Sequence, residues 1–159
     1  MIRQVDIRQP DIAHRVHALQ QAAYTVESQL IGYPDLPPLR ETRADLQHSA
    51  EQFLTYEEEG QIAGAVSYVR LDDTLDICRL VVSPAFFRRG IAGKLLKAVE
   101  TGEPGIRQIT VSTAEKNLPA VTLYQKYGYQ VVRRTVLADG LVLVELRKQI
   151  GGSAATISR

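Results

Sequence analysis

The chain has 159 residues, a length that suits one domain with a short tail. Hydrophobic residues make up 45% and charged residues 23%, so a long disordered chain, a collagen and a coiled-coil rod are excluded. Nineteen Lys and Arg against eighteen Asp and Glu leave a formal charge of +1. That balance predicts neither a nucleic-acid partner nor an acidic surface for metals or basic proteins.

Cysteine and histidine are scarce. The single cysteine, Cys78, excludes an internal disulfide and a multi-thiolate zinc site. The three histidines (His14, His17 and His48) are too scattered for a metal-binding pattern, so no metal is expected. Residues 1–6 lack the apolar core of a secretory signal, and no stretch reaches the roughly 18 apolar residues of a membrane span. We therefore expect a cytoplasmic protein without membrane association.

Seven segments have the character of strands. The first stops before Pro10, the next three form an antiparallel meander joined by short polar turns, and the last two flank the hairpin turn at residues 138–140. The acidic run at residues 57–59 is expected at a solvated hairpin tip. The predicted strands are residues 2–8, 53–57, 62–70, 74–82, 109–113, 131–137 and 141–146.

Apolar residues three and four positions apart predict the helices. The first is expected to have Asp11 as its N-cap and an apolar stripe from Ile12 to Leu30. Gly32 and the prolines after it cannot continue that helix. The other predicted helices are residues 39–49, a segment from Ile91 to the break at 102–105, and residues 119–127, which stop at Gly128.

This order of elements predicts the fold class α/β (α+β). The sheet is expected to be mixed and largely antiparallel, with helices on both faces and parallel neighbours only where a helix intervenes. We predict one domain over residues 1–148. The Gly- and Ser-rich residues 149–159 are expected to form a flexible C-terminal tail.

The turn after the strand 74–82 carries a candidate anion site. A helix start leaves about four backbone N–H groups without an intrahelical partner, and the helix dipole favours negative charge there. Three small residues leave room for an anion, and three cations add positive charge: Gly90, Ala92 and Gly93, and Arg88, Arg89 and Lys94. We predict a phosphate or pyrophosphate site. The alternative is an ordinary strand-to-helix turn with surface arginines.

Two familiar phosphate motifs do not fit this turn. Arg88 and Leu95 stand where a P-loop needs Gly and Ser or Thr, and only one half of a dinucleotide fingerprint is present. The segment instead resembles the phosphate-binding motif of the GNAT acyltransferases: Arg or Gln, two residues, Gly, one residue, then Gly or Ala. Gly90 and Ala92 match that pattern, whereas Phe87 replaces the Arg or Gln.

A second, looser block of the same family occurs downstream. Residues 117–129 resemble the family's Asn, two residues, Ala, two residues, Leu-Tyr, two residues, Leu-Gly-Phe, with Tyr127 and Tyr129 as mild substitutions. The order of elements also matches over residues 1–147. The resemblance implies a GNAT-like fold and an N-acetyltransferase that uses acetyl-CoA as acyl donor.

The resemblance also implies where acetyl-CoA binds. The donor would enter a gap between the strand ending at Val82 and the strand ending near Thr113. Strand backbone and Asn117 would bind the pantetheine arm, the amides of the turn would hold the pyrophosphate, and Tyr124 would lie near the sulfur. The residues implied in donor binding are Leu80, Val81, Val82, Arg88, Arg89, Gly90, Ile91, Ala92, Gly93, Lys94, Asn117 and Tyr124.

The implied reaction is direct attack of a primary amine on the thioester in a ternary complex. The backbone N–H near Val82 would stabilise the oxyanion, and Tyr124 would donate a proton to the thiolate. Asp76 is a candidate general base because some family members carry a glutamate there. The alternative is an exposed strand residue or a partner of Arg79. Rival bases are Glu27, Tyr24 and Tyr68.

The acceptor is expected beside the first two helices, their Pro-rich connection and the last hairpin. Tyr24, Glu27 and Tyr33 are the candidate acceptor-binding residues, and a small-molecule or peptide amine is the expected partner of a monomer or homodimer. Two other functions stay open. One is a non-catalytic acyl-CoA sensor or docking module of the same fold, and the other is a nucleotide-binding domain that uses the same anion site.

Overall fold

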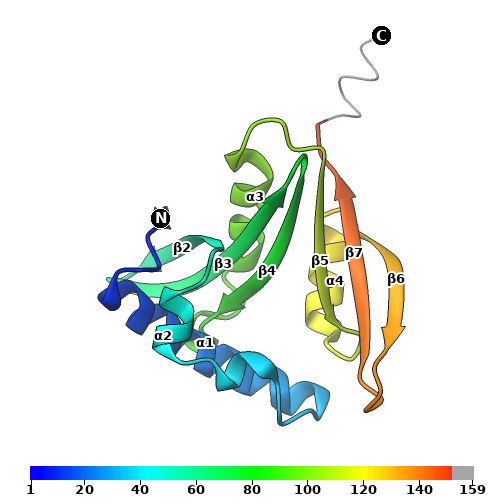
Figure 1. Cartoon of the computed structure of the whole chain (residues 1–159), viewed down its shortest axis with the longest axis horizontal. Coiled ribbons are helices and arrows are strands. Elements are labelled where there is room, and N and C mark those ends of the chain that lie inside the picture. The colour runs from blue at the N-terminus through cyan, green and yellow to red at the C-terminus, as the bar shows by residue number, and fades with distance from the viewer. Residues whose placement is uncertain (152–159) are drawn as a thin grey trace.

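The computed structural model describes residues 1–151 and contains a seven-stranded sheet in the order β1-β2-β3-β4-β5-β7-β6 (Figure 1). Every neighbouring pair is antiparallel except β4 and β5, which are parallel and separated in sequence by helix α3. The strands are β1 (Ile2–Val5), β2 (Gln52–Glu58), β3 (Gln61–Leu71), β4 (Thr74–Val82), β5 (Gln108–Ala114), β6 (Gln130–Val136) and β7 (Val142–Gln149).

Helices cover both faces of this sheet. The helices are α1 (Pro10–Ile31), the 3-10 turn η1 (Pro37–Arg40), α2 (Arg43–Gln47), the 3-10 turn η2 (Pro84–Phe86), α3 (Ile91–Gly102) and α4 (Leu118–Lys126). One buried cluster joins α1 and α2 to the sheet through side chains such as Val16 and Phe53. Another joins α3 and α4 to the opposite face through Leu95 and Tyr124. The predicted mixed, largely antiparallel fold class is confirmed.

The first helix differs in detail from the prediction. Its N-cap is Gln9, not Asp11, because Pro10 occupies the first helical position, where a missing N–H costs nothing. Asp11 lies in the first turn instead, where the helix dipole favours a carboxylate. The far end of the expected apolar stripe is not buried, since Val26 and Leu30 are exposed.

The predicted helix 39–49 is wrong as one continuous element. Residues 37–40 form η1, and α2 begins only after Thr42. The Thr42 side chain accepts a hydrogen bond from the Asp45 N–H, and the Asp45 carboxylate accepts one from the Thr42 N–H. This capping box defines a new helix start and interrupts the longer helix.

The C-terminal elements also shift from their predicted bounds. α4 ends at Lys126 with Tyr127 as its C-cap, and Gly128 follows with a φ of 94°. The last strand extends through Gln149, and the Ile150 N–H donates to the Arg107 carbonyl, so the first two residues of the predicted tail are ordered parts of the sheet end. Residues 152–159 of that tail lie outside the described residues.

A fork in the sheet positions the site. β4 and β5 pair only between residues 74–77 and 108–111, and beyond that point β3 is the one partner of β4 in the part of the chain that the structure describes. Figure 1 shows the two strands diverging below their shared upper end. Cys78 is the extra residue of a β-bulge that follows Ile77, the last residue paired with β5. Bulges bend and twist a strand, which accounts for the separation at this point.

Among the residues that the structure describes, no helix combines the length and the apolar character needed to cross a bilayer.

Candidate active site

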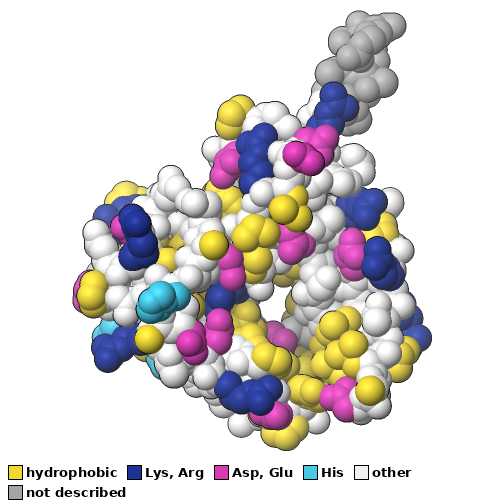
Figure 2. All heavy atoms as spheres, viewed as in Figure 1, with side chains coloured by type: hydrophobic (Ala, Val, Ile, Leu, Met, Phe, Trp, Pro, Cys, Tyr) yellow, Lys and Arg dark blue, Asp and Glu magenta, His cyan; other side chains and the backbone are white. Residues whose placement is uncertain are grey.

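Two cavities meet at the fork. The first, here called the fork cavity, lies between β4 and β5, has a volume of about 220 Å³ and appears as a hollow in Figure 2. The second, the loop cavity, has about 190 Å³ and lies between α1, the end of β4 and the segment before α3. Both cavities are lined by the same four residues at their common wall: Tyr24, Glu27, Leu80 and Asn117.

The loop before α3 has the backbone geometry of an anion site. Gly90 is the N-cap in a left-handed conformation with a φ of 74°, and Arg88 also has a positive φ of 67°. No side chain caps this helix. The first-turn N–H groups of α3 are therefore available to a ligand, as expected for the predicted phosphate site.

The predicted cations of this loop have different surroundings. Arg89 forms ion pairs with Glu58 at 3.2 Å and Glu59 at 3.5 Å, and it stacks on Phe86. The predicted acidic hairpin tip therefore partly neutralises this arginine. Lys94 lies 5.3 Å from the centre of the Tyr56 ring. Arg88 has no ion pair within residues 1–151 and is exposed.

The structure shows the surroundings of two residues of the motif, Gly93 and Phe87, which the sequence did not reveal. A side chain at Gly93 would collide with the Tyr127 hydroxyl, so this glycine is needed for close packing of α3 against α4. Its small size does not by itself open a path to an anion. Phe87, which replaces the family's Arg or Gln, is 47% exposed and lines the loop cavity with an apolar surface.

Glu27 lies at the common wall of the two cavities. Burial raises the pKa of its carboxyl group above the ordinary 4.5, and the neighbouring Asn117 side chain partly opposes that rise. Asn117 is the N-cap of α4, and its Oδ1 accepts a hydrogen bond from the Ala120 N–H at 3.2 Å. Its side-chain amide thus faces Glu27 while its oxygen caps the helix. A carboxyl group with a raised pKa in a cavity can act as a general base.

The two candidate tyrosines lie close to this carboxyl group. Tyr124 on α4 is 5% exposed, lines the fork cavity and contacts Tyr129 edge-on at 5.7 Å. Burial, with a smaller contribution from the Glu27 charge, raises the pKa of Tyr124, and the same two causes raise that of Tyr24. Both phenols are therefore protonated at neutral pH and can donate a proton.

Asp76 and Cys78 lie two residues apart on β4, and only Cys78 lines a cavity. The Asp76 carboxylate accepts a hydrogen bond from the Thr110 hydroxyl at 2.6 Å and is not among the residues that line either cavity. Cys78 lines the fork cavity, where partial desolvation, with the nearby Glu51 and Asp76 charges, raises the pKa of its thiol to about 11. A thiol with this pKa is a poor nucleophile at neutral pH.

Tyr33 is not among the residues that line the two cavities. Its hydroxyl donates to the Asp139 carboxylate and joins the end of α1 to the hairpin between β6 and β7. Leu36 and Leu141, from the same two segments, line the fork cavity. The structure thus brings Tyr24 and Glu27 together with Asn117 and Leu80, whereas Tyr33 lies outside the lining of both cavities.

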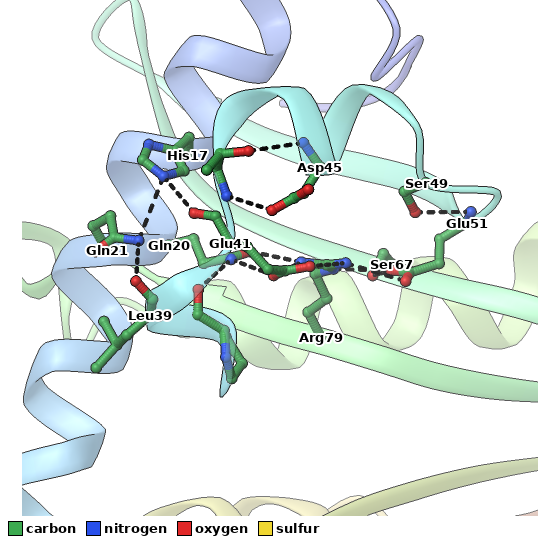
Figure 3. A network of polar contacts seen from close by, with 12 residues as sticks. His17, Gln20, Gln21, Leu39, Glu41, Asp45, Ser49, Glu51, Ser67 and Arg79 are labelled. Atoms are coloured by element: carbon green, nitrogen blue, oxygen red, sulfur yellow. Dashed lines mark hydrogen bonds and ion pairs between the residues drawn. The ribbon is translucent and has the colours of Figure 1, made fainter. Parts of the chain in front are cut away.

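A buried network beside the fork cavity was missed at the sequence level. Arg79 lines the cavity with a side chain that is only 10% exposed and binds both Glu41 and Glu51 (Figure 3). Gln20 and Ser67 complete the network by donating to these carboxylates. The five members come from five separate segments, so no local pattern could have revealed their association.

Comparisons with known proteins agree with this geometry. The profile of the Acetyltransferase (GNAT) domain matches residues 19–150. The UPF0157 protein YqkA of Bacillus subtilis (strain 168) is 39% identical over 143 residues, which cover 90% of this chain and 42% of that protein. The chain therefore spans less than half the length of that curated relative.

Solved structures share the fold at low sequence identity. The ribosomal-protein-S18-alanine N-acetyltransferase of Escherichia coli has a TM-score of 0.75 and 14% identity, covering 95% of this chain and 94% of its own. Aminoglycoside 6'-acetyltransferase type Ii has a TM-score of 0.74 and 17% identity, covering 95% and 97%. With the domain profile covering most of its length, the chain belongs to the GNAT acetyltransferase family.

Proposed function

We propose that this protein transfers an acetyl group from acetyl-CoA to a primary amine by direct attack in a ternary complex. The observation that carries the proposal is the meeting of two cavities at Glu27, within the fork between β4 and β5. The loop cavity extends from Phe87, beside the anion-binding loop, to this wall and suits the arm of the donor, whose thioester would enter the fork beside Tyr124. The rest of the fork cavity suits the acceptor.

The donor would bind along the loop cavity. Beyond Ile77 the β4 edge that faces β5 has no strand partner among residues 1–151, so the backbone of residues 80–82 can pair with an extended pantetheine arm. The amides of residues 88–94 would hold the pyrophosphate. Leu80, Val82 and Phe87 give this cavity an apolar lining that suits the arm. Asn117 would position Glu27 as well as contact the pantetheine.

The reaction needs one base and one acid. The Glu27 carboxylate would accept a proton from the acceptor ammonium, and the neutral amine would attack the thioester carbonyl carbon. An amide of β4 near Val82 would stabilise the oxyanion. As the carbon–sulfur bond breaks, the Tyr124 hydroxyl would give its proton to the thiolate of coenzyme A. Glu27 is preferred to Asp76 because only Glu27 lines both cavities.

Release of free thiol from acetyl-CoA tests this proposal. We expect amine-dependent thiol release by the intact chain and none by Gly90→Val, because a β-branched residue cannot readily adopt the positive φ of Gly90. Coenzyme A binding should be lost in parallel, as measured by calorimetry. Donor binding without thiol release from any amine would indicate a sensor module instead.

Tyr124→Phe tests the proton donor. This variant keeps the ring contact with Tyr129 and removes only the hydroxyl, so the melting temperature should change little. We expect kcat to fall about 10-fold, because a thiolate leaves without much help from an acid, and coenzyme A affinity to stay the same. Steady-state kinetics beside calorimetry separate the two effects. An equal loss of turnover and affinity would mean that Tyr124 only positions the donor.

A further inference from the structure

The charges around the fork cavity restrict its acceptor. Among the described residues that line the cavity, Glu27 and Arg79 are the only charged side chains. Glu27 is at the wall shared with the loop cavity, where the reacting amine would lie. The question is therefore whether Arg79 could bind a carboxylate group of an acceptor.

Arg79 has no free N–H group that could bind the acceptor amine's own carboxylate. Its guanidinium carries five N–H groups. Nε donates to Glu51 at 2.9 Å, and Nη2 donates to Glu41 at 3.2 Å and to Glu51 at 3.1 Å. Nη1 donates to Gln20 at 2.9 Å and to Glu41 at 2.6 Å. Five hydrogen bonds thus match five donors, and the group is saturated by the protein itself.

The local charge also opposes an anionic acceptor. Arg79 carries one formal positive charge, whereas Glu41 and Glu51 carry two negative charges, so this network has a net charge of −1. Hydrogen bonds from Arg79 and Ser67 outweigh the effect of burial and hold the pKa of Glu51 below its ordinary value, which keeps it ionised. An acceptor carboxylate would be desolvated here without a cationic partner, and that is costly.

The remaining wall combines aliphatic side chains with short polar ones. Leu36, Pro38, Leu141 and Leu143 line the fork cavity together with Ser112 and Thr113. None of these side chains offers a positive charge to a carboxylate. The volume of about 220 Å³ is below the roughly 300–1,000 Å³ of sites for drug-sized ligands, so the part of the acceptor inside is small.

From these observations we infer that the acceptor is a small primary amine whose body carries no carboxylate. Amino acids are excluded as preferred acceptors. The inference rests on the proposed function and deepens it, because it names the chemical class of the amine.

Matched acceptors test the inference with acetyl-CoA at saturation. The pairs are 2-phenylethylamine against phenylalanine and pentylamine against 6-aminohexanoic acid, together with phenylalaninamide. We expect kcat/KM for each amine to exceed that of its carboxylate-bearing counterpart by about 100-fold or more, with phenylalaninamide in between. Turnover of the carboxylate-bearing amines equal to that of their counterparts would overturn the inference and leave the proposed function intact.

A variant tests whether the hydrogen-bond saturation of Arg79 causes the selectivity against acceptors that carry a carboxylate. Glu41→Gln keeps the size of the side chain but removes one negative charge, so the network becomes neutral and Nη2 of Arg79 loses its carboxylate oxygen on residue 41. We expect the rate with phenylalanine to rise relative to 2-phenylethylamine, with the melting temperature recorded as a control. An unchanged ratio would overturn the assignment of this selectivity to Arg79. Absence of thiol release from every amine, with coenzyme A still bound, would instead overturn the proposed function itself.

Discussion

Glu27→Gln is expected to lower kcat by about 100- to 10,000-fold, the contribution typical of a positioned general base. The amide has the size of the carboxylate but cannot take a proton from the acceptor ammonium. Binding of coenzyme A should change little, because the donor depends on the β4 edge and the loop before α3. Single-turnover thiol release, with calorimetry for donor binding, measures both quantities.

The pH profile identifies the base more specifically than the rate alone. Burial raises the pKa of Glu27 above 4.5, and the base is active only when ionised, so activity should fall on the acidic side as pH drops through this raised pKa. Glu27→Gln should abolish that acidic limb. Asp76→Asn, which removes a carboxylate bonded to Thr110 outside the cavity lining, should retain it. The reverse pattern would make Asp76 the base.

Arg79→Met is expected to destabilise the fold by about 3–5 kcal/mol, the cost of removing one partner from a buried ion pair. Methionine has a similar length but leaves Glu41 and Glu51 without their cation. Both carboxylates are themselves only 29% and 19% exposed. Denaturant unfolding at neutral pH measures this change.

A matched variant and a pH series test whether the stability lost in Arg79→Met is electrostatic. Arg134→Met removes a two-hydrogen-bond pair with Glu115 at the exposed surface and should change stability little. The folded-state pKa of Glu51 lies below its ordinary 4.5, so the stability from this ion pair is present above pH 4.5 and is lost as pH falls through the folded pKa. The difference in the free energy of unfolding between wild type and Arg79→Met should become smaller in that range. A constant gap would contradict an electrostatic origin.

Features that depend on neighbouring residues could be predicted from the sequence. The strand 74–82 matches β4, and the helix from Ile91 matches α3. The turn between them has the free amides expected of an anion site. The prediction of one helix over residues 39–49 was wrong, because the capping box at Thr42 starts a new helix inside that segment.

Features that depend on contacts between distant segments could not be predicted in this way. The pKa of Glu27 depends on burial, which raises it, and on Asn117, 90 positions further along the chain, which partly opposes that rise. The saturation of Arg79 requires acceptors from α1 and from the segments at Glu41 and Glu51. The close packing at Gly93 likewise depends on Tyr127, the C-cap of α4.

The sequence by itself determined the order of elements, because that order follows from periodicity, and it indicated the family through two motifs of residues close together in the chain. It also located the turn before α3 that is proposed to bind an anion. Only the tertiary structure decided which carboxyl group faces both cavities and which arginine is unavailable to a ligand. Burial, pKa and hydrogen-bond saturation depend on groups that folding brings together from separate segments, and no local spacing encodes them.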